Sequence, residues 1–217
     1  PKAIAAVKQE LENVHRYPDA NGFSLKRALS QTLGFSAKNL VLGNGSDEVI
    51  TLVLKAYVEP EEEILTADPT FLVYRLAGQV AGAVVREVPL KDYRYDLTAM
   101  RKAVSDKTRV IFIANPDNPT GSFVTASEVT AFMKDLPDSV LVVFDEAYFE
   151  LAQVPEFPQT LDYVRENKPV VVTRTFSKAY GLSGLRIGYG VAPEEIADAL
   201  NRVREPFNVN RLALVAA

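Results

Sequence analysis

The chain has 217 residues, of which 47% are hydrophobic and 24% are charged. These proportions are typical of a globular protein, and the length suffices for one sizeable domain with a buried core. The net charge of −4 arises from 24 basic and 28 acidic residues, and the basic residues form no block. We therefore expect no nucleic acid as a partner.

Residue usage excludes several kinds of site. Cysteine is absent, which rules out disulfides and thiolate metal sites, and a single histidine, His15, cannot build a histidine-rich metal site. No apolar run reaches the roughly 18 residues that a membrane span needs. We expect a cytoplasmic protein with no metal and no membrane contact. Because the chain begins with Pro1, we also expect that it is truncated or processed, with any targeting segment lost.

Hydrophobic periodicity predicts helices and strands along the whole chain. In the first helix Ile4, Val7 and Leu11 share one face, and Ser24 is the expected cap of the second. In chain order the expected elements are helix 1–12, helix 24–33, strand 39–42, helix 47–57, strand 63–66, helix 71–80, strand 84–88, helix 97–104, strand 109–114, helix 127–136, strand 140–144, strand 169–173, strand 187–191 and helix 194–204.

Strands that alternate with helices predict an α/β fold, with a mainly parallel sheet covered by helices on both faces. One connection departs from this pattern. Between the strands at 169–173 and 187–191 the chain is too short for a crossover helix, and Gly181 and Gly184 interrupt it. We therefore expect the strand at 187–191 to run antiparallel to its neighbours.

The segment 175–188 carries the strongest chemical signal. Lys178 lies just beyond an apolar strand, where poor hydration would favour the neutral, nucleophilic amine. Such an amine forms a Schiff base with an aldehyde, while Arg186 and the hydroxyls nearby suit a phosphate. An aldehyde and a phosphate together indicate pyridoxal 5'-phosphate (PLP). The alternative is a solvated Ser-Lys pair in a surface loop, which is the more frequent case for such a pair taken alone.

Two further groups follow strands, at the edge where sheets of this kind bind ligands. The glycine turn 43–47 precedes a helix, so it presents backbone N–H groups to an anion, or is an ordinary turn capped by Ser46 or Asp47. The loop 115–121 holds Asn118, whose amide is suited to donate to a phenolate or a carboxylate. A rigid turn with no ligand is the alternative for this loop.

Asp145 directly follows the apolar strand 140–144, where an unpaired carboxylate is costly. A protonated pyridine nitrogen would be a suitable partner, and the pair would hold the ring as an electron sink; a helix N-cap is the alternative. Tyr148, three residues on, either contacts the ring hydroxyl or is a half-buried tyrosine. Tyr74 offers a face for stacking on a planar ring, although an aromatic residue on a helix belongs more often to the core.

In this order the groups resemble the fold-type I PLP-dependent aminotransferases. The segments that carry the resemblance are NPDNPTG at 115–121, DEAY at 145–148 and SKAYGLSGLRIG at 177–188. Within that superfamily the chain resembles most the histidinol-phosphate aminotransferases, through RYPD at 16–19, GNGSDE at 43–48 and PFNVN at 206–210. Related decarboxylases and aromatic aminotransferases share much of this pattern.

The resemblance implies a role for each matched residue. Lys178 would hold PLP as a Schiff base and shuttle the proton between Cα and the cofactor, and Asp145 would pair with the pyridine nitrogen. Asn118 and Tyr148 would contact the ring hydroxyl, and Tyr74 would stack on the ring. The side chains implied around the phosphate are Ser46, Asp47, Thr175, Ser177 and Arg186.

The resemblance also implies an activity and an assembly. The reaction would be transfer of an amino group from an amino donor, histidinol phosphate, to 2-oxoglutarate in histidine biosynthesis. Tyr17 matches a tyrosine that reaches the cofactor phosphate of the neighbouring subunit, which implies a homodimer with shared sites. Residues 1–217 match the PLP-binding large domain only, so we expect the N-terminal arm and C-terminal small domain to be absent. The alternatives are another class I/II PLP enzyme, an aromatic aminotransferase or a threonine-phosphate-type decarboxylase, and a non-catalytic PLP-binding domain.

Overall fold

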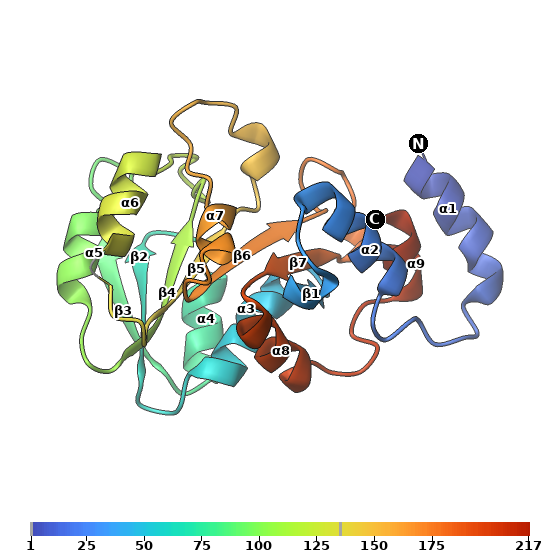
Figure 1. Ribbon diagram of the computed structural model, residues 1–217, viewed down its shortest axis with the longest axis horizontal. Coiled ribbons are helices and arrows are strands. Elements are labelled where there is room, and N and C mark those ends of the chain that lie inside the picture. Colours follow the sequence, from blue (N-terminus) through green and yellow to red (C-terminus); the bar gives the residue numbers. More distant parts are fainter. Residues whose placement is uncertain (1, 135) are drawn as a thin grey trace.

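A mixed sheet of seven strands runs through the centre of the molecule (Figure 1). The computed structural model describes residues 2–134 and 136–217. The strands, in the order in which they lie across the sheet, are β1 (Leu40–Gly43), β7 (Gly188–Val191), β6 (Val170–Thr175), β5 (Leu141–Asp145), β4 (Thr108–Ala114), β2 (Glu63–Asp68) and β3 (Val84–Pro89). β7 runs in the direction opposite to the other six strands of this sheet, which confirms the predicted fold class and the predicted direction of that strand.

Helices surround the sheet. The α-helices are α1 (Lys2–Glu10), α2 (Phe23–Leu33), α3 (Ser46–Tyr57), α4 (Val73–Val80), α5 (Leu97–Ala103), α6 (Ala126–Lys134), α7 (Leu161–Arg165), α8 (Glu194–Val203) and α9 (Arg211–Ala216). The single-turn 3-10 helices are η1 (Leu11–Asn13), η2 (Ala37–Asn39), η3 (Phe149–Leu151) and η4 (Ser183–Leu185). The sequence-based prediction did not include α7, α9 or the 3-10 turns, because three to six residues are too few to establish a helical period.

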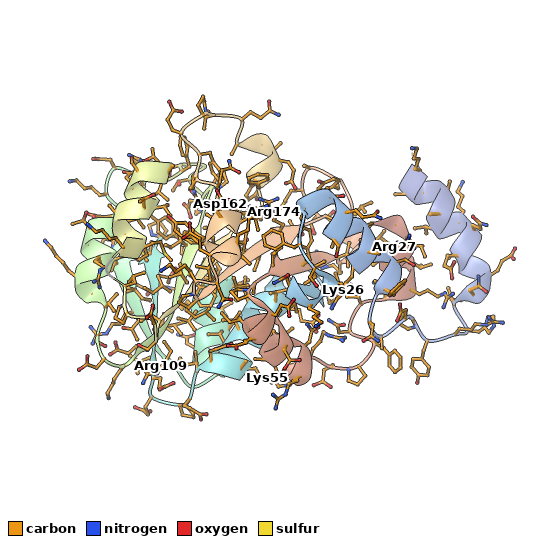
Figure 2. All side chains as sticks on the ribbon, in the orientation of Figure 1. Lys26, Arg27, Lys55, Arg109, Asp162 and Arg174 are labelled. Atoms are coloured by element: carbon orange, nitrogen blue, oxygen red, sulfur yellow. The ribbon has the colours of Figure 1, made fainter. Side chains whose placement is uncertain are left out.

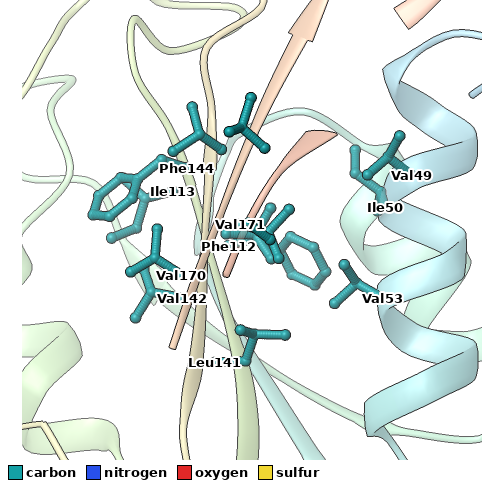
Figure 3. Packing of buried hydrophobic residues seen from close by; sticks show 14 of the residues in the cluster. Val49, Ile50, Val53, Phe112, Ile113, Leu141, Val142, Phe144, Val170 and Val171 are labelled. Atoms are coloured by element: carbon teal, nitrogen blue, oxygen red, sulfur yellow. The ribbon is translucent and has the colours of Figure 1, made fainter. Parts of the chain in front are cut away.

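The core has one layer on each face of the sheet (Figure 3). Phe112 and Val171 lie on the face toward α3, whereas Phe144 and Val170 lie on the opposite face, and all four are fully buried. The ring of Tyr163 on α7 stacks on Phe144, with centroids 6.4 Å apart, so a helix covers that face too. Successive residues of a strand point to opposite faces, which explains why the central strands read as continuous apolar runs.

Several predicted helix limits differ from the structure by one or two residues; for example, α1 ends at Glu10 rather than at 12, and α4 begins at Val73 rather than at 71. Gly22, with φ of 57°, is the N-cap of α2, so Ser24 lies inside the helix and does not cap it. The carboxylate of Asp19 instead accepts from the backbone N–H groups of Asn21 and Phe23, at 2.9 and 2.7 Å. Helix α6 ends at Lys134 rather than at 136. Residues 1 and 135, which fall within two of the predicted helices, lie outside the described residues.

Helix α1 lies beside α9, at the end of the molecule farthest from β3 (Figure 1). The apolar face predicted for the first helix is only partly covered there, since Ile4 is 53% and Leu11 50% exposed. Within the described residues no helix has the length and the apolar content to cross a membrane.

Candidate functional site

A cavity of about 240 Å³ opens where β4, β5 and β6 end and where α3 and α4 begin. Every site residue predicted from the sequence contributes to its lining, with the exception of Tyr17. Residues separated by more than a hundred positions meet here because the carboxyl ends of parallel strands share one edge of a sheet. The lining side chains are Ser46, Asp47, Phe71, Tyr74, Ala114, Pro116, Asn118, Asp145, Ala147, Tyr148, Thr175, Ser177, Lys178 and Arg186.

One corner of the cavity is built to receive an anion. Helix α3 begins at Ser46 behind the N-cap Gly45, and no side chain caps it, so neither Ser46 nor Asp47 takes the alternative role of cap. The first N–H groups of this 12-residue helix therefore remain available. Two glycines allow other groups to pack closely against the backbone here. A Cβ on Gly188 would lie 2.4 Å from the Ser46 nitrogen, and a Cβ on Gly45 would lie 2.7 Å from Nη2 of Arg186.

Arg186 lies at the same corner because the chain after β6 folds back on itself. Its Nη2 donates to Oδ2 of Asp47 at 3.2 Å, and its Nη1 donates to the carbonyl of Ser183 at 3.0 Å. The hydroxyl of Thr175 accepts from the N–H of Ser177 at 3.1 Å, which holds the start of this loop. A guanidinium, two hydroxyls and a helix start thus surround one point, an arrangement suited to a phosphate.

Asp145, the last residue of β5, is a buried carboxylate with no cationic partner among the described residues. Its Oδ2 accepts from the hydroxyl of Tyr74 at 2.7 Å, and its Oδ1 accepts from the hydroxyl of Thr173 at 3.1 Å. Burial raises the pKa of Asp145, and these hydrogen bonds oppose the rise. Throughout the described residues no lysine or arginine pairs with it. It does not cap a helix, since the following turn, η3, has Tyr148 at its N-cap.

Tyr74 is both a core residue and a cavity residue. Its ring is fully buried and stacks on Phe112, with centroids 4.8 Å apart and planes 8° apart. Burial, followed by the charge of Asp145, raises the pKa of its hydroxyl well above the usual range, so that the hydroxyl remains a donor. Phe71 lines the same cavity edge-on to Tyr74, at 5.6 Å, and is a second aromatic candidate for stacking on a ligand. Sequence reasoning missed Phe71, because one phenylalanine before a helix carries no pattern.

Lys178 lies at the mouth of the cavity, with Nζ 5.2 Å from the centroid of the Tyr148 ring. Its side chain is exposed, so the expectation of a poorly hydrated lysine is wrong for the chain as it stands. The reason is its place in the fold: β6 ends at Thr175, and Lys178 belongs to the loop beyond it.

The asparagine loop is held by hydrogen bonds of its own. The carboxylate of Asp117 accepts from the hydroxyls of Thr70 and Thr120, each at 2.7 Å. Asn115 is fully buried, and it exchanges two hydrogen bonds with the backbone of Val124, at 2.9 and 3.2 Å. The side chains of Asn115 and Asp117 are thus occupied by hydrogen bonds within the protein, whereas Asn118 lines the cavity.

Tyr17 lies apart from this cavity. It is 79% exposed, and its ring stacks on that of Phe207, with centroids 4.7 Å apart. The extended segment before Pro18 thus projects the tyrosine into solvent, away from the residues with which it was grouped.

The sequence matches the family "Aminotransferase class I and II" over residues 1–217, and the chain belongs to that family. It is 49% identical to histidinol-phosphate aminotransferase 2 of Pseudomonas fluorescens and 48% identical to the histidinol-phosphate aminotransferase of Moorella thermoacetica. Both matches cover 100% of this chain, and they cover 59% and 56% of those two proteins.

A solved structure shares the fold along the whole chain. The histidinol-phosphate aminotransferase of Sinorhizobium meliloti, in complex with pyridoxal-5'-phosphate, superposes with a TM-score of 0.94 at 33% sequence identity. That match covers 100% of this chain and 59% of the other. The resemblance to fold-type I aminotransferases is thereby confirmed, and the chain spans about three fifths of the length of these relatives.

Proposed function

We propose that the cavity binds PLP and that Lys178 holds it covalently through its aldehyde. The observation that carries the proposal is the meeting, in one cavity, of an amine, an anion corner and the buried, unpaired carboxylate of Asp145. PLP offers a matching group to each of them: an aldehyde, a phosphate and a basic ring nitrogen. Gly45 and Gly188 supply the close backbone approach that a phosphate requires.

In this proposal each side chain has a distinct task. When bound, PLP supplies the electron sink for the pair of electrons left on Cα when its proton is removed. Asp145 keeps a proton on the pyridine nitrogen, and Tyr74 orients Asp145 through its hydroxyl. Lys178 takes the proton from Cα and returns it. Asn118 and Tyr148 contact the ring hydroxyl.

The remaining lining side chains bind and orient the cofactor. The side chains that surround the phosphate in this proposal are Ser46, Asp47, Thr175, Ser177 and Arg186. The residue that stacks on the cofactor ring in this proposal is Tyr74, as in the sequence-based prediction, or Phe71, which also lines the cavity.

The proposed reaction is transfer of an amino group from histidinol phosphate to 2-oxoglutarate in histidine biosynthesis. The support is the 49% and 48% identity to relatives that carry the name histidinol-phosphate aminotransferase. Because the chain spans 59% of the first relative, the donor specificity of the whole protein stays a proposal, as does the assignment of residues 1–217 to a PLP-binding large domain. A decarboxylase, an aromatic aminotransferase and a non-catalytic PLP-binding domain are the alternatives that the test below separates.

We further propose a homodimer in which Tyr17 completes the phosphate site of the neighbouring subunit. Its exposure and its distance from the chain's own cavity support this role, since an exposed tyrosine held by Phe207 is free to contact a second copy. A place in the cytoplasm likewise remains a prediction. Sedimentation of the wild type and of Tyr17→Ala tests the assembly, and the PLP affinity of both proteins tests the shared site.

Borohydride reduction of the PLP-loaded protein, followed by peptide mapping, tests the cofactor assignment. We expect the pyridoxyl label on Lys178 and a visible absorption band that reduction abolishes. A label on another lysine would contradict the assignment. Histidinol phosphate, aromatic amino acids and threonine phosphate are then supplied separately, with the absorption followed in time. A response to histidinol phosphate alone supports the proposed donor. No response to any of them fits the binding-domain alternative and equally an aminotransferase whose residues 1–217 are inactive alone.

A further inference from the structure

A buried cluster lies behind the cavity, on the opposite face of β5 and β6. Glu146 follows Asp145, and Arg174 follows Thr173, so these side chains project away from the cavity. Nε and Nη2 of Arg174 both donate to Oε2 of Glu146, at 2.9 and 2.8 Å. The hydroxyl of Thr160 donates to Oε1 of the same carboxylate. Figure 2 labels Arg174 near the middle of the molecule, unlike Lys55 and Arg109 near its lower margin.

Arg174 also contacts the turn that carries Tyr148. Its guanidinium carbon lies 3.5 Å from the centroid of the Phe149 ring. The N–H of Phe149 in turn donates to the carbonyl of Glu146 at 3.1 Å, which closes the turn. Arg174 therefore binds a residue before Tyr148 and a residue after it. A charge-assisted bond from two nitrogens and a desolvated cation–π contact are among the stronger non-covalent interactions.

The cluster is coupled to the cavity by the strand pairing. The N–H of Glu146 donates to the carbonyl of Thr173 at 2.9 Å, and the hydroxyl of Thr173 donates to Asp145 at 3.1 Å. The pair Asp145–Thr173 thus faces the cavity, and the adjacent pair Glu146–Arg174 lies on the opposite face of the sheet. Arg174 touches the Tyr148 turn directly but reaches Asp145 only through the backbone, so a change at Arg174 should move Tyr148 first.

We propose that Arg174 is a positioning residue: by binding Glu146 and stacking on Phe149 it holds the turn 146–151 so that Tyr148 faces the cavity. Its consequence for PLP rests on the proposed function, in which Tyr148 contacts the ring hydroxyl. Arg174 itself lines no part of the cavity. Its effect on the cofactor is therefore expected to pass through Tyr148.

Hydrogen exchange without PLP tests the first half of the proposal. Arg174→Lys keeps the positive charge but removes the planar guanidinium, which donates two hydrogen bonds to Glu146 and stacks on the Phe149 ring. We expect the amides of Phe149 and Leu151 to exchange about tenfold faster in this variant, because the turn opens more often. Amides in the middle of β4 should keep their wild-type rates. Unchanged exchange at Phe149 and Leu151, or an equal increase in β4, would overturn the proposal.

Arg165→Lys is the matched control. The Arg165 guanidinium also lies over a ring, that of Phe35 at 4.7 Å, and also pairs with a carboxylate, Asp162 at 2.7 Å. Both charged groups are exposed and neither lines the cavity, so this substitution should leave the exchange of the turn unchanged. If Arg174→Lys does not fold, Phe149→Leu replaces it. This variant keeps the ion pair and removes the ring, together with its edge-on contact with Phe157, and it should speed exchange of the turn by about threefold.

A double-mutant cycle with PLP tests the second half. Wild type, Arg174→Lys, Tyr148→Phe and the double variant are compared in PLP affinity and in the pH midpoint of the visible absorption. We expect Arg174→Lys to weaken PLP binding by about tenfold and to move the pH midpoint of the absorption. In the Tyr148→Phe background the same substitution should change neither quantity. Additive effects would overturn the proposal. A wild type that binds no PLP would instead refute the proposed function, while hydrogen exchange still decides whether Arg174 holds the turn.

Discussion

The two faces of the sheet at the end of β5 carry neighbouring acids with opposite surroundings. Asp145 and Glu146 are consecutive and both buried, and burial raises the pKa of each carboxyl. Glu146 faces the guanidinium of Arg174, which works against that rise, while Asp145 faces the hydroxyls of Tyr74 and Thr173. Among the residues that the structure describes, Glu146 has a counter-charge and Asp145 has none.

We propose that this difference separates a structural acid, Glu146, from a functional one, Asp145. A buried carboxylate without a counter-charge destabilises the fold, so its presence at a cavity supports the proposal that a bound ligand supplies the missing cation. A buried carboxylate that accepts two hydrogen bonds from one arginine has its counter-charge without a ligand. Substitution of Asp145 should therefore affect chemistry far more than stability, and substitution of Glu146 the reverse. Four measurements, from the largest expected effect to the smallest, test this contrast.

Asp145→Asn should slow removal of the Cα proton by several orders of magnitude, because asparagine cannot hold the pyridine nitrogen protonated. PLP should still bind and still be reduced onto Lys178. The measurement is the rate at which the visible absorption changes after histidinol phosphate is added. Asp162→Asn, which removes an exposed carboxylate outside the cavity, is the control and should react as fast as the wild type. A near-normal rate in Asp145→Asn would contradict the proposed role of the Asp145 carboxylate in removal of the Cα proton.

Glu146→Ala should lower the free energy of unfolding by about 3–5 kcal/mol, since it leaves the Arg174 charge buried and unpaired. The urea midpoint of the chain without PLP measures the loss. Asp162→Ala, which breaks the exposed pair with Arg165, is the control and should cost about 0.5 kcal/mol or less. Similar losses in the two variants would mean that burial does not distinguish these ion pairs.

Arg186→Ala should weaken PLP binding by about one to two orders of magnitude, because a hydrogen bond to a charged group contributes roughly 1.5–3 kcal/mol. Pyridoxal, which lacks the phosphate, should bind equally well to both proteins. Titrations of the two ligands, followed by absorption, provide the comparison. Equal losses for PLP and pyridoxal would point to a distorted cavity rather than to a lost phosphate contact.

The smallest effect concerns the stability of the chain without PLP. The pKa of Asp145 is raised in the folded state above its unfolded value of about 3.9, so the folded state binds that proton more tightly. The resulting stabilisation is present below pH 4 and is lost as the pH rises through the folded-state pKa. Asp145→Asn should remove this dependence and raise the unfolding free energy at pH 7 by roughly 1 kcal/mol or less. Urea midpoints from pH 4 to pH 8 measure it, and a less stable variant at pH 7 would contradict the prediction.

Much of the fold could be predicted because its signals are local. The apolar runs of the central strands, and helices such as α3 and α8, have periods that a short window reveals. The antiparallel direction of β7 followed from the length of the connection that precedes it. Short elements such as α7 were missed for the same reason, since they contain too few residues to show a period.

The sequence by itself indicated most of the polar residues that line the cavity, because their motifs follow strands whose ends share one edge of the sheet, but it did not indicate Phe71. Tertiary structure alone decided which side chains form hydrogen bonds and ion pairs with one another. Tyr74 and Asp145 are 71 positions apart, and Glu146 and Arg174 are 28 apart, so their hydrogen bonds depend on strand register and helix placement. It also left Lys178 exposed in a loop beyond β6. A motif specifies residue types at a strand end, whereas counter-charge and hydration come from segments that only the folded chain brings alongside.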